Sequence, residues 1–154
     1  MVLQDRLVDE MKEAMKSGDK KRVSVIRMLR SSIKNKEIAK GKDTKLSEDE
    51  VIQVIISSIR QGRDSIEEFK KGGRQDLAEK EEDEIRILQA FLPEQMPKEE
   101  LMEVIKETVR EVNAVGPKDM GRVMKILMPK IAGKADPSTA SNIVKEILVE
   151  AAGK

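Results

Sequence analysis

The sequence contains no cysteine, histidine, tyrosine or tryptophan, and its only aromatic residues are Phe69 and Phe91. Without cysteine it forms no disulfide or thiolate zinc site, and without histidine it lacks the Ser-His-Asp triad, the Cys-His pair and the His-ligated metal site. Recognition of single-stranded RNA usually relies on aromatic side chains that stack on bases. These absences disfavour ordinary enzymology and base stacking, and they leave recognition of backbone and shape open.

Long apolar runs are also absent. The longest uncharged stretch is VIQVIISSI at 51–59, which is too short to cross a bilayer, and the charged start MVLQDRLVDEMKEAM lacks the apolar region of a signal peptide. We therefore expect no membrane segment and a cytoplasmic location. Charged residues make up 38% of the chain and aromatics 1%, with few glycines and prolines, which favours solvated helices. The composition predicts an all-α fold.

Apolar residues recur at three- and four-residue steps along most of the chain, which is the period of an amphipathic helix. The pattern predicts helices over 3–15, 20–40, 48–71, 74–90, 101–109, 120–128 and 137–148. Pro93 and Pro97 interrupt the pattern and mark a boundary. We expect an N-terminal four-helix bundle over 1–92 and a C-terminal three-helix bundle over 93–154.

Three motifs resemble functional sites but lack essential parts. The glycine spacing over 116–121 is that of a phosphate-binding P-loop, yet Arg122 and Val123 stand where Lys and Ser/Thr are required. The acidic run over 79–84 is more typical of a solvated helix face than of a metal site. No strained elbow or oxyanion loop accompanies a Ser-Lys pair. We therefore expect no metal and no cofactor.

A first basic ridge is predicted on the helix over 120–128. At 100° per residue, Lys118, Arg122 and Lys125 lie within about 60° of one another. Lys130 and Lys134 follow just past Pro129. Such a ridge can meet phosphates or can be ordinary solvated surface.

The opposite face of the same helix is apolar and carries methionines, which fill irregular gaps in small cores. We predict that Met120 and Met124 belong to that core and that the helix breaks at Pro129. Gly121 costs about 1 kcal/mol in a helix interior relative to alanine, so it indicates close approach of another helix or of an RNA backbone.

A second basic ridge is predicted on the helix over 20–40, formed by Arg27, Arg30 and Lys34. Residues 12–45 contain twelve Lys and Arg but only four Asp and Glu. Ligand binding has an alternative, because the acidic stretch over 76–84 can neutralise this ridge through intramolecular ion pairs. Each such pair contributes little to stability if it is exposed.

Three long stretches carry a family resemblance: SIRQGRDSIEEFKKGGRQDLAEKEEDEIRILQAFLP (58–93), KDMGRVMKILMPK (118–130) and GKADPSTASNIVKEIL (133–148). Together they resemble the YqeY family of small bacterial proteins. The C-terminal part also resembles the tail domain of the GatB component of the glutamine-dependent Asp/Glu-tRNA amidotransferase. There the resemblance implies a helical module that helps to hold tRNA. The residues that fit the pattern of that domain are Gly121, Met128, Gly133, Lys134, Ala135 and Pro137.

The sequence departs from that resemblance at Lys125, where glycine is frequent, at Asp136, where the amidotransferase has Asn, and at Pro97, where a polar cap is usual. The family label implies carbon–nitrogen ligase activity with glutamine as amido donor. That chemistry needs a nucleophile that releases ammonia and a phosphate site that activates a carboxylate, and we find neither. We therefore expect an amidotransferase-like chain without catalytic activity of its own.

These observations predict a non-catalytic module associated with tRNA. The predicted contacts are Lys118, Arg122, Lys125, Lys130 and Lys134, with Arg27, Arg30 and Lys34 as a second set and Gly121 and Gly133 as points of backbone approach. The alternative is an adaptor that docks on a translation or tRNA-charging enzyme. An autonomous enzyme is the third and least favoured possibility.

Overall fold

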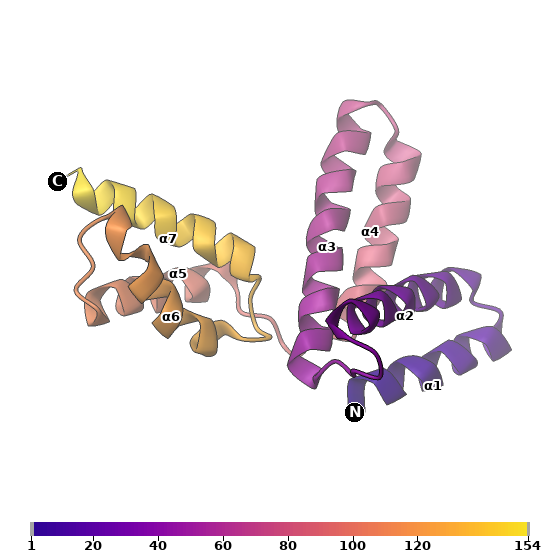
Figure 1. Ribbon diagram of the computed structural model, residues 1–154. Helices are drawn as coiled ribbons and strands as arrows, with labels where there is room; N and C mark the ends of the chain where they lie inside the picture. The colour runs from indigo at the N-terminus through magenta and orange to yellow at the C-terminus, as the bar shows by residue number, and fades with distance from the viewer. Residues whose placement is uncertain (1, 154) are drawn as a thin grey trace. The chain divides into compact units, whose positions relative to one another are not determined.

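A computed structural model describes residues 2–153, and over that range the chain is helical with no strand (Figure 1). The predicted all-α fold is confirmed. The chain divides into two compact units, Met1–Leu92 and Pro93–Lys154. The α-helices are α1 (Val2–Ser17), α2 (Lys20–Lys40), α3 (Glu48–Lys71), α4 (Gln75–Gln89), α5 (Lys98–Glu111), α6 (Met120–Ile131) and α7 (Pro137–Ala152).

Polar caps fix where the helices of the first unit begin. The Asp19 carboxylate accepts the backbone N–H of Arg22 at the start of α2. At the start of α3, Ser47 and Glu50 form a reciprocal capping box. Lys40 donates to the Glu50 carboxylate at 2.7 Å, and this bond together with the Ser47 amide lowers the pKa of Glu50 to about 2. The loop between α2 and α3 is therefore held at both ends.

The core of the first unit is built on α3, which packs most extensively on α4 and also contacts α1 and α2. Ile26, Val51 and Ile55 are completely buried there. Gly62 lies where α3 meets α4, and a Cβ at this position would lie 3.1 Å from both the Glu81 carboxylate and the Ile85 side chain. The absence of a side chain at Gly62 allows the two helices to approach closely.

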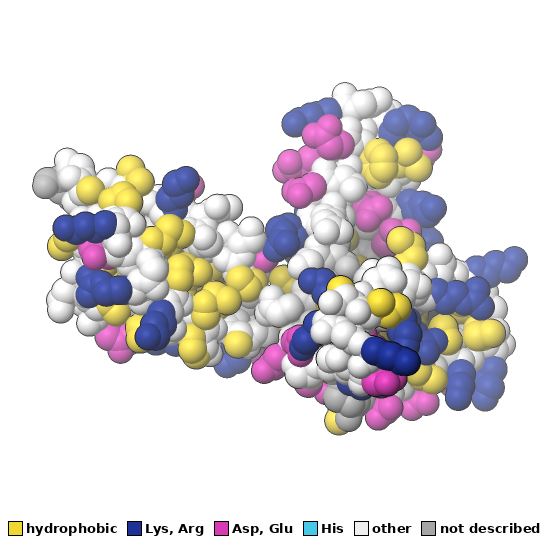
Figure 2. Space-filling model, in the orientation of Figure 1, with side chains coloured by type: hydrophobic (Ala, Val, Ile, Leu, Met, Phe, Trp, Pro, Cys, Tyr) yellow, Lys and Arg dark blue, Asp and Glu magenta, His cyan; other side chains and the backbone are white. Residues whose placement is uncertain are grey.

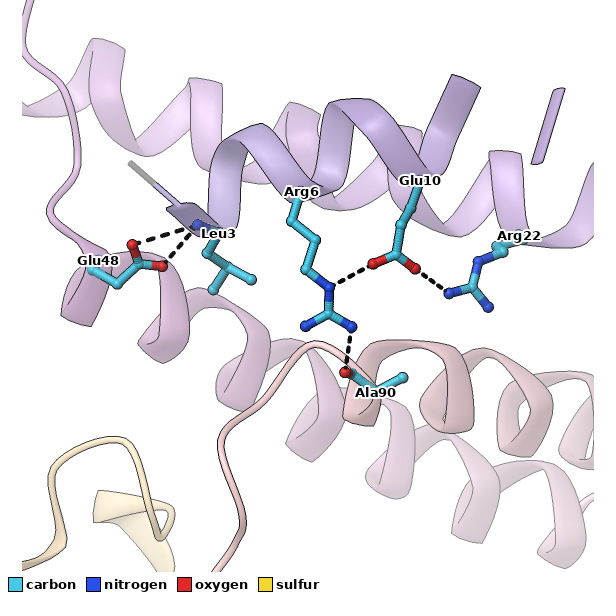
Figure 3. Close-up of polar contacts among 6 residues, drawn as sticks. All are labelled: Leu3, Arg6, Glu10, Arg22, Glu48 and Ala90. Carbon is cyan, nitrogen blue, oxygen red and sulfur yellow. Dashed lines mark hydrogen bonds and ion pairs between the residues drawn. The ribbon is translucent and has the colours of Figure 1, made fainter. Parts of the chain in front are cut away.

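Polar contacts hold α1 against the rest of the first unit (Figure 3). Arg6 donates to the Ala90 carbonyl at 2.9 Å, and the Glu10 carboxylate joins Arg6 to Arg22. The Arg6 guanidinium also lies 4.9 Å from the centre of the Phe91 ring, which is a cation–π contact. Arg6 and Arg22 thus stabilise the packing of the first unit.

The second unit packs α5, α6 and α7 around a separate core in which Ile105, Leu127 and Leu148 are completely buried. The segment over 93–97 is fastened to the turn between α6 and α7. The Met96 amide donates to the Lys134 carbonyl at 2.8 Å, and the Gln95 side chain donates to the Gly133 carbonyl at 2.9 Å. This proline-containing segment therefore belongs structurally to the second unit.

The structure corrects two details of the predicted basic helix. Lys118 lies in a 3₁₀ turn, Pro117–Asp119, so α6 starts after it and the predicted common helix face does not include it. The predicted break at Pro129 is wrong, because α6 continues to Ile131. A proline in the last turn removes only one helical hydrogen bond, and its fixed φ suits a helix. Met120 and Met124 pack on the core as predicted, whereas Met128 is 38% exposed.

Candidate nucleic-acid interface

The five cations of the first predicted ridge fall into two groups. Lys118, Lys125 and Lys134 are exposed, and the described residues provide no hydrogen bond or ion pair for their side chains. Arg122 and Lys130 instead bind groups of their own unit. The structure therefore does not bring all five cations together as one free surface.

Arg122 braces the turn that precedes α6. It donates to Asp119 at 2.8 Å and to the Val112 carbonyl at 3.1 Å. Asp119 in turn accepts the amides of Val115 at 2.8 Å and Gly116 at 3.4 Å. The Val115 amide, followed by Arg122, lowers the pKa of Asp119. Since the Asp119 carboxylate already accepts these amides, a phosphate at this turn would have to displace it.

Lys130 is partly buried between α6 and α5. Its ammonium group donates to the Thr108 hydroxyl at 3.0 Å and to Glu111 at 2.8 Å. Thr108 is completely buried, so this contact satisfies a hydroxyl inside the unit. A ligand contact at Lys130 would compete with that internal contact.

The two glycines predicted as points of backbone approach differ in their surroundings. Gly121 is exposed, and a Cβ there would meet no atom of a neighbouring element within 4 Å among residues 2–153. No helix of the second unit therefore requires glycine at this position. Gly133 is buried with φ of 75°, a left-handed conformation that favours glycine, and its carbonyl is already bonded to Gln95. The turn itself explains Gly133.

The second predicted ridge is brought together in the structure. Arg27, Arg30 and Lys34 line one groove between α1 and α2, with a volume of about 600 Å³. Sequence reasoning missed a fourth cation, Lys45, which reaches the groove from the loop before α3. We name these four residues the groove cations. None of them forms an ion pair with a carboxylate among the described residues.

Glu37 explains why Lys45 lies beside α2. This residue is 5% exposed, and its carboxylate accepts the Leu46 amide at 3.0 Å and the Gln4 side chain at 3.5 Å. The Leu46 hydrogen bond is the main cause of the lowered pKa of Glu37, and the charges of Lys45 and Lys34 add to it. A glutamate beside the apolar stripe of α2 was the signal in the sequence that the following loop folds back.

The acidic helix α4 does not neutralise the groove cations. Asp83 accepts from Lys21 at 2.7 Å, and Lys70 lies 3.6 Å from Glu82. Lys21 lies on a face of α2 other than the one that lines the groove, and Lys70 lies on α3. Lys and Arg side chains, drawn dark blue, gather over the α1–α2 part of the first unit (Figure 2). The alternative interpretation of this ridge, in which intramolecular ion pairs compensate it, holds for Lys21 and not for Arg27, Arg30 or Lys34.

No helix in the described range 2–153 combines the length and the apolar character of a membrane span. The fold and surface thus define a two-unit helical protein with an open basic groove. The model of the Yqey-like protein family matches residues 4–148, and the chain belongs to this YqeY family.

The chain is similar to fungal proteins named "Altered inheritance of mitochondria protein 41, mitochondrial". It is 35% identical to the Lachancea thermotolerans protein over 147 residues, which cover 93% of this chain and 77% of that protein. It is 34% identical to the Vanderwaltozyma polyspora protein over 125 residues, which cover 81% of this chain and 66% of that protein. These names state no activity and no ligand.

The relatives contradict two expectations from the sequence. We expected a bacterial protein and a cytoplasmic location, whereas these similar proteins are fungal and are named as mitochondrial. Composition cannot distinguish the two compartments, because a charged helical chain without cysteine suits either of them. The bacterial and cytoplasmic assignments are therefore withdrawn.

Proposed function

We propose that the protein is a non-catalytic RNA-binding module that holds the phosphate backbone of tRNA. The observation that carries this proposal is the exposed face of α2, where Arg27, Arg30 and Lys34 form no ion pair among the described residues although an acidic helix lies in the same unit. Cations left without intramolecular partners are available to phosphates, whose neutralisation releases counterions and supplies most of the affinity for a nucleic-acid backbone.

The spacing along α2 supports backbone contact. Lys20, Arg27 and Lys34 recur every seven residues, so they lie on one face about 10.5 Å apart along the axis. Ser24 and Ser31 are exposed between them on the same face. Lysine, arginine and serine are residue types that commonly contact phosphate oxygens. A row of this kind positions a backbone without reading its sequence.

The second unit contributes a weaker surface in this proposal. Lys118, Lys125 and Lys134 are exposed and form no ion pair among the described residues, and the resemblance of this part to a tRNA-holding tail domain favours tRNA as the ligand. Arg122 and Lys130 support the unit from within. We therefore assign the principal contact to α2 and a supplementary contact to the second unit.

Equilibrium binding of a tRNA transcript to the purified full chain tests this proposal. Binding should weaken linearly with salt on a logarithmic scale, with a slope of about −0.7 to −0.9 per phosphate contact. Replacing Arg27, Arg30 and Lys34 together by Glu should reduce the affinity roughly 100-fold at low salt. It should also reduce the magnitude of the salt slope by the amount that corresponds to about three phosphate contacts.

A matched control changes the charge equally at exposed lysines elsewhere. Lys36, Lys80 and Lys106 lie on α2, α4 and α5, and none of them lines the groove. Replacing these three by Glu should reduce the affinity much less than the α2 substitutions. No binding at low salt, or equal losses for both triple variants, would overturn the proposal.

A second candidate function, docking of a protein partner, is favoured by one apolar feature. Ala14, Met15, Val23 and Met28 line a second groove near the turn between α1 and α2, and Met15 and Met28 are 53% and 65% exposed. Recovery of one defined partner from nuclease-treated lysate, lost on replacing Met15 and Met28 by Glu, would favour this function over RNA binding. Recovery only with intact RNA would count against it.

A further inference from the structure

We infer that the α1–α2 groove is a binding site for a compact phosphate group, such as the 5′-phosphate end of an RNA or a free triphosphate. The groove differs from the exposed row on α2 because it is concave. Its volume of about 600 Å³ is in the range of ligand sites. A phosphate that enters it is approached from several directions.

Cations from two elements converge on this groove. Arg27, Arg30 and Lys34 come from α2, and Lys45 comes from the loop that Glu37 holds in place. Arg30 makes only a weak contact, from its guanidinium to the Met11 sulfur at 3.8 Å. Planar guanidinium groups bind phosphate oxygens through paired hydrogen bonds.

Neutral donors and an apolar floor complete the site. The Ser31 hydroxyl and the Gln4 amide line the groove beside the cations. Leu7, Val8 and Ile33 form its apolar part. Apolar walls lower the local dielectric constant and strengthen the attraction between the cations and an anion.

Two carboxylates limit the affinity of the groove. Glu37 stays ionised because its pKa is lowered, but its carboxylate already accepts the Leu46 amide and the Gln4 side chain. Asp5 is exposed in the lining and has no hydrogen bond or ion pair among the described residues. Four cations against two carboxylates leave the groove net positive. Removing the Asp5 charge should therefore tighten the binding of an anion.

Tripolyphosphate titrated into the full chain at low salt tests the site without RNA, by calorimetry and by amide shifts in an NMR spectrum. Saturable binding with shifts at Ser31 and Leu46 is expected. Replacing Arg30 and Lys45 together by Glu should weaken it at least about tenfold. Asp5→Asn should tighten it about twofold to fivefold. Lys36→Glu, on the same helix but outside the groove, should leave it nearly unchanged.

A second arm identifies the source of the phosphate and rests on the proposed RNA function. A tRNA transcript with a 5′-phosphate should bind several-fold tighter than the same transcript with a 5′-hydroxyl, and Arg30→Glu/Lys45→Glu should abolish that difference. If tripolyphosphate binds but the two transcripts bind equally, the site stands and takes a free phosphate ligand.

The two proposals fail separately. If tRNA does not bind while tripolyphosphate does, RNA binding fails and the phosphate site stands. If tripolyphosphate shows no saturable binding at millimolar concentration, or binds the Arg30→Glu/Lys45→Glu variant equally well, the phosphate site is overturned whatever tRNA does. Unchanged circular dichroism and amide dispersion in the variants, whose replaced side chains are exposed, exclude loss of the fold as the cause.

Discussion

The two units use their cations differently, although both present a basic helix in the sequence. In the first unit, Arg27, Arg30 and Lys34 form no ion pair with a carboxylate among the described residues, and they line an open groove. In the second unit, Arg122 closes a turn and Lys130 reaches a buried hydroxyl. A run of charge on a helix face therefore indicates ligand contact only where the neighbouring elements leave it free.

The units also differ in how they use a glycine within a helix. Gly62 in α3 is buried against Glu81 and Ile85 of α4, where a Cβ would be 3.1 Å from both side chains. Gly121 in α6 is exposed with open space around it. The first glycine serves the packing of its unit, and the second has no packing role in its own unit.

The largest expected effect is on the stability of the first unit. Gly62→Leu forces a side chain into the contact between α3 and α4, and overpacking of this kind costs about 1–3 kcal/mol. Urea unfolding followed through amide resonances of each unit measures the change separately for the two. Gly121→Leu is the matched control and should be nearly neutral. Equal destabilisation by both substitutions would contradict the packing difference.

The next effect is on RNA binding by the second unit. Replacing the exposed Lys118, Lys125 and Lys134 by Glu should weaken tRNA binding about tenfold, less than the triple variant of α2, because the three α2 cations share one groove. The same equilibrium binding assay at several salt concentrations compares the two. A larger loss from the second unit would reverse our assignment of the principal contact.

A smaller effect concerns the pH dependence of the first unit. Burial, reinforced by Glu84, raises the pKa of Glu81 above its usual 4.5. Protonated Glu81 stabilises the folded state, and this stabilisation is lost as the pH rises through the raised pKa. Glu81→Gln should therefore stabilise the first unit at pH 7, with the difference from wild type vanishing near pH 4. A constant difference across this range would show that the charge is not responsible.

For Asp119 in the second unit, we expect a pH dependence of stability with the opposite sign. The Val115 amide and Arg122 lower the pKa of Asp119 below its usual 3.8. The ionised carboxylate therefore contributes its full stabilisation above pH 3.8, and this stabilisation is lost as the pH falls through the lowered pKa. Asp119→Asn should destabilise the second unit at pH 7 and match wild type more closely below pH 3. Amide resonances of the second unit during acid titration provide the measurement, and a gap that persists at low pH would refute this account.

Periodicity predicted the helices well because each buries one apolar face. The predicted range 74–90 is observed as Gln75–Gln89, and 20–40 is observed as Lys20–Lys40. The ends were less accurate where no cap marks them. Helix α5 begins at Lys98, three residues before its first buried residue, Leu101, and a helical wheel cannot detect such a polar first turn.

The candidate site was predicted only in part. The pattern on one helix placed Arg27, Arg30 and Lys34 on a shared side, because that relation is local in sequence. Lys45 was missed because it reaches the groove through a loop whose position depends on the buried Glu37. The Val112 carbonyl that binds Arg122 and the Glu111 carboxylate that binds Lys130 lie outside α6, so the pattern on this one helix gave no indication of them.

The smallest expected effect separates the two meanings of the exposed glycine. Gly121→Ala should stabilise the second unit by a few tenths of a kcal/mol, less than the roughly 0.5–1 kcal/mol of a helix interior, because Gly121 lies in the first turn of α6. If an RNA backbone approaches α6 at Gly121, the added methyl group should weaken tRNA binding while stability rises. Lys145→Ala, an exposed change on α7, controls for substitution at the surface. Higher stability with unchanged tRNA binding would remove Gly121 from the interface and leave the contact of this unit to Lys118, Lys125 and Lys134.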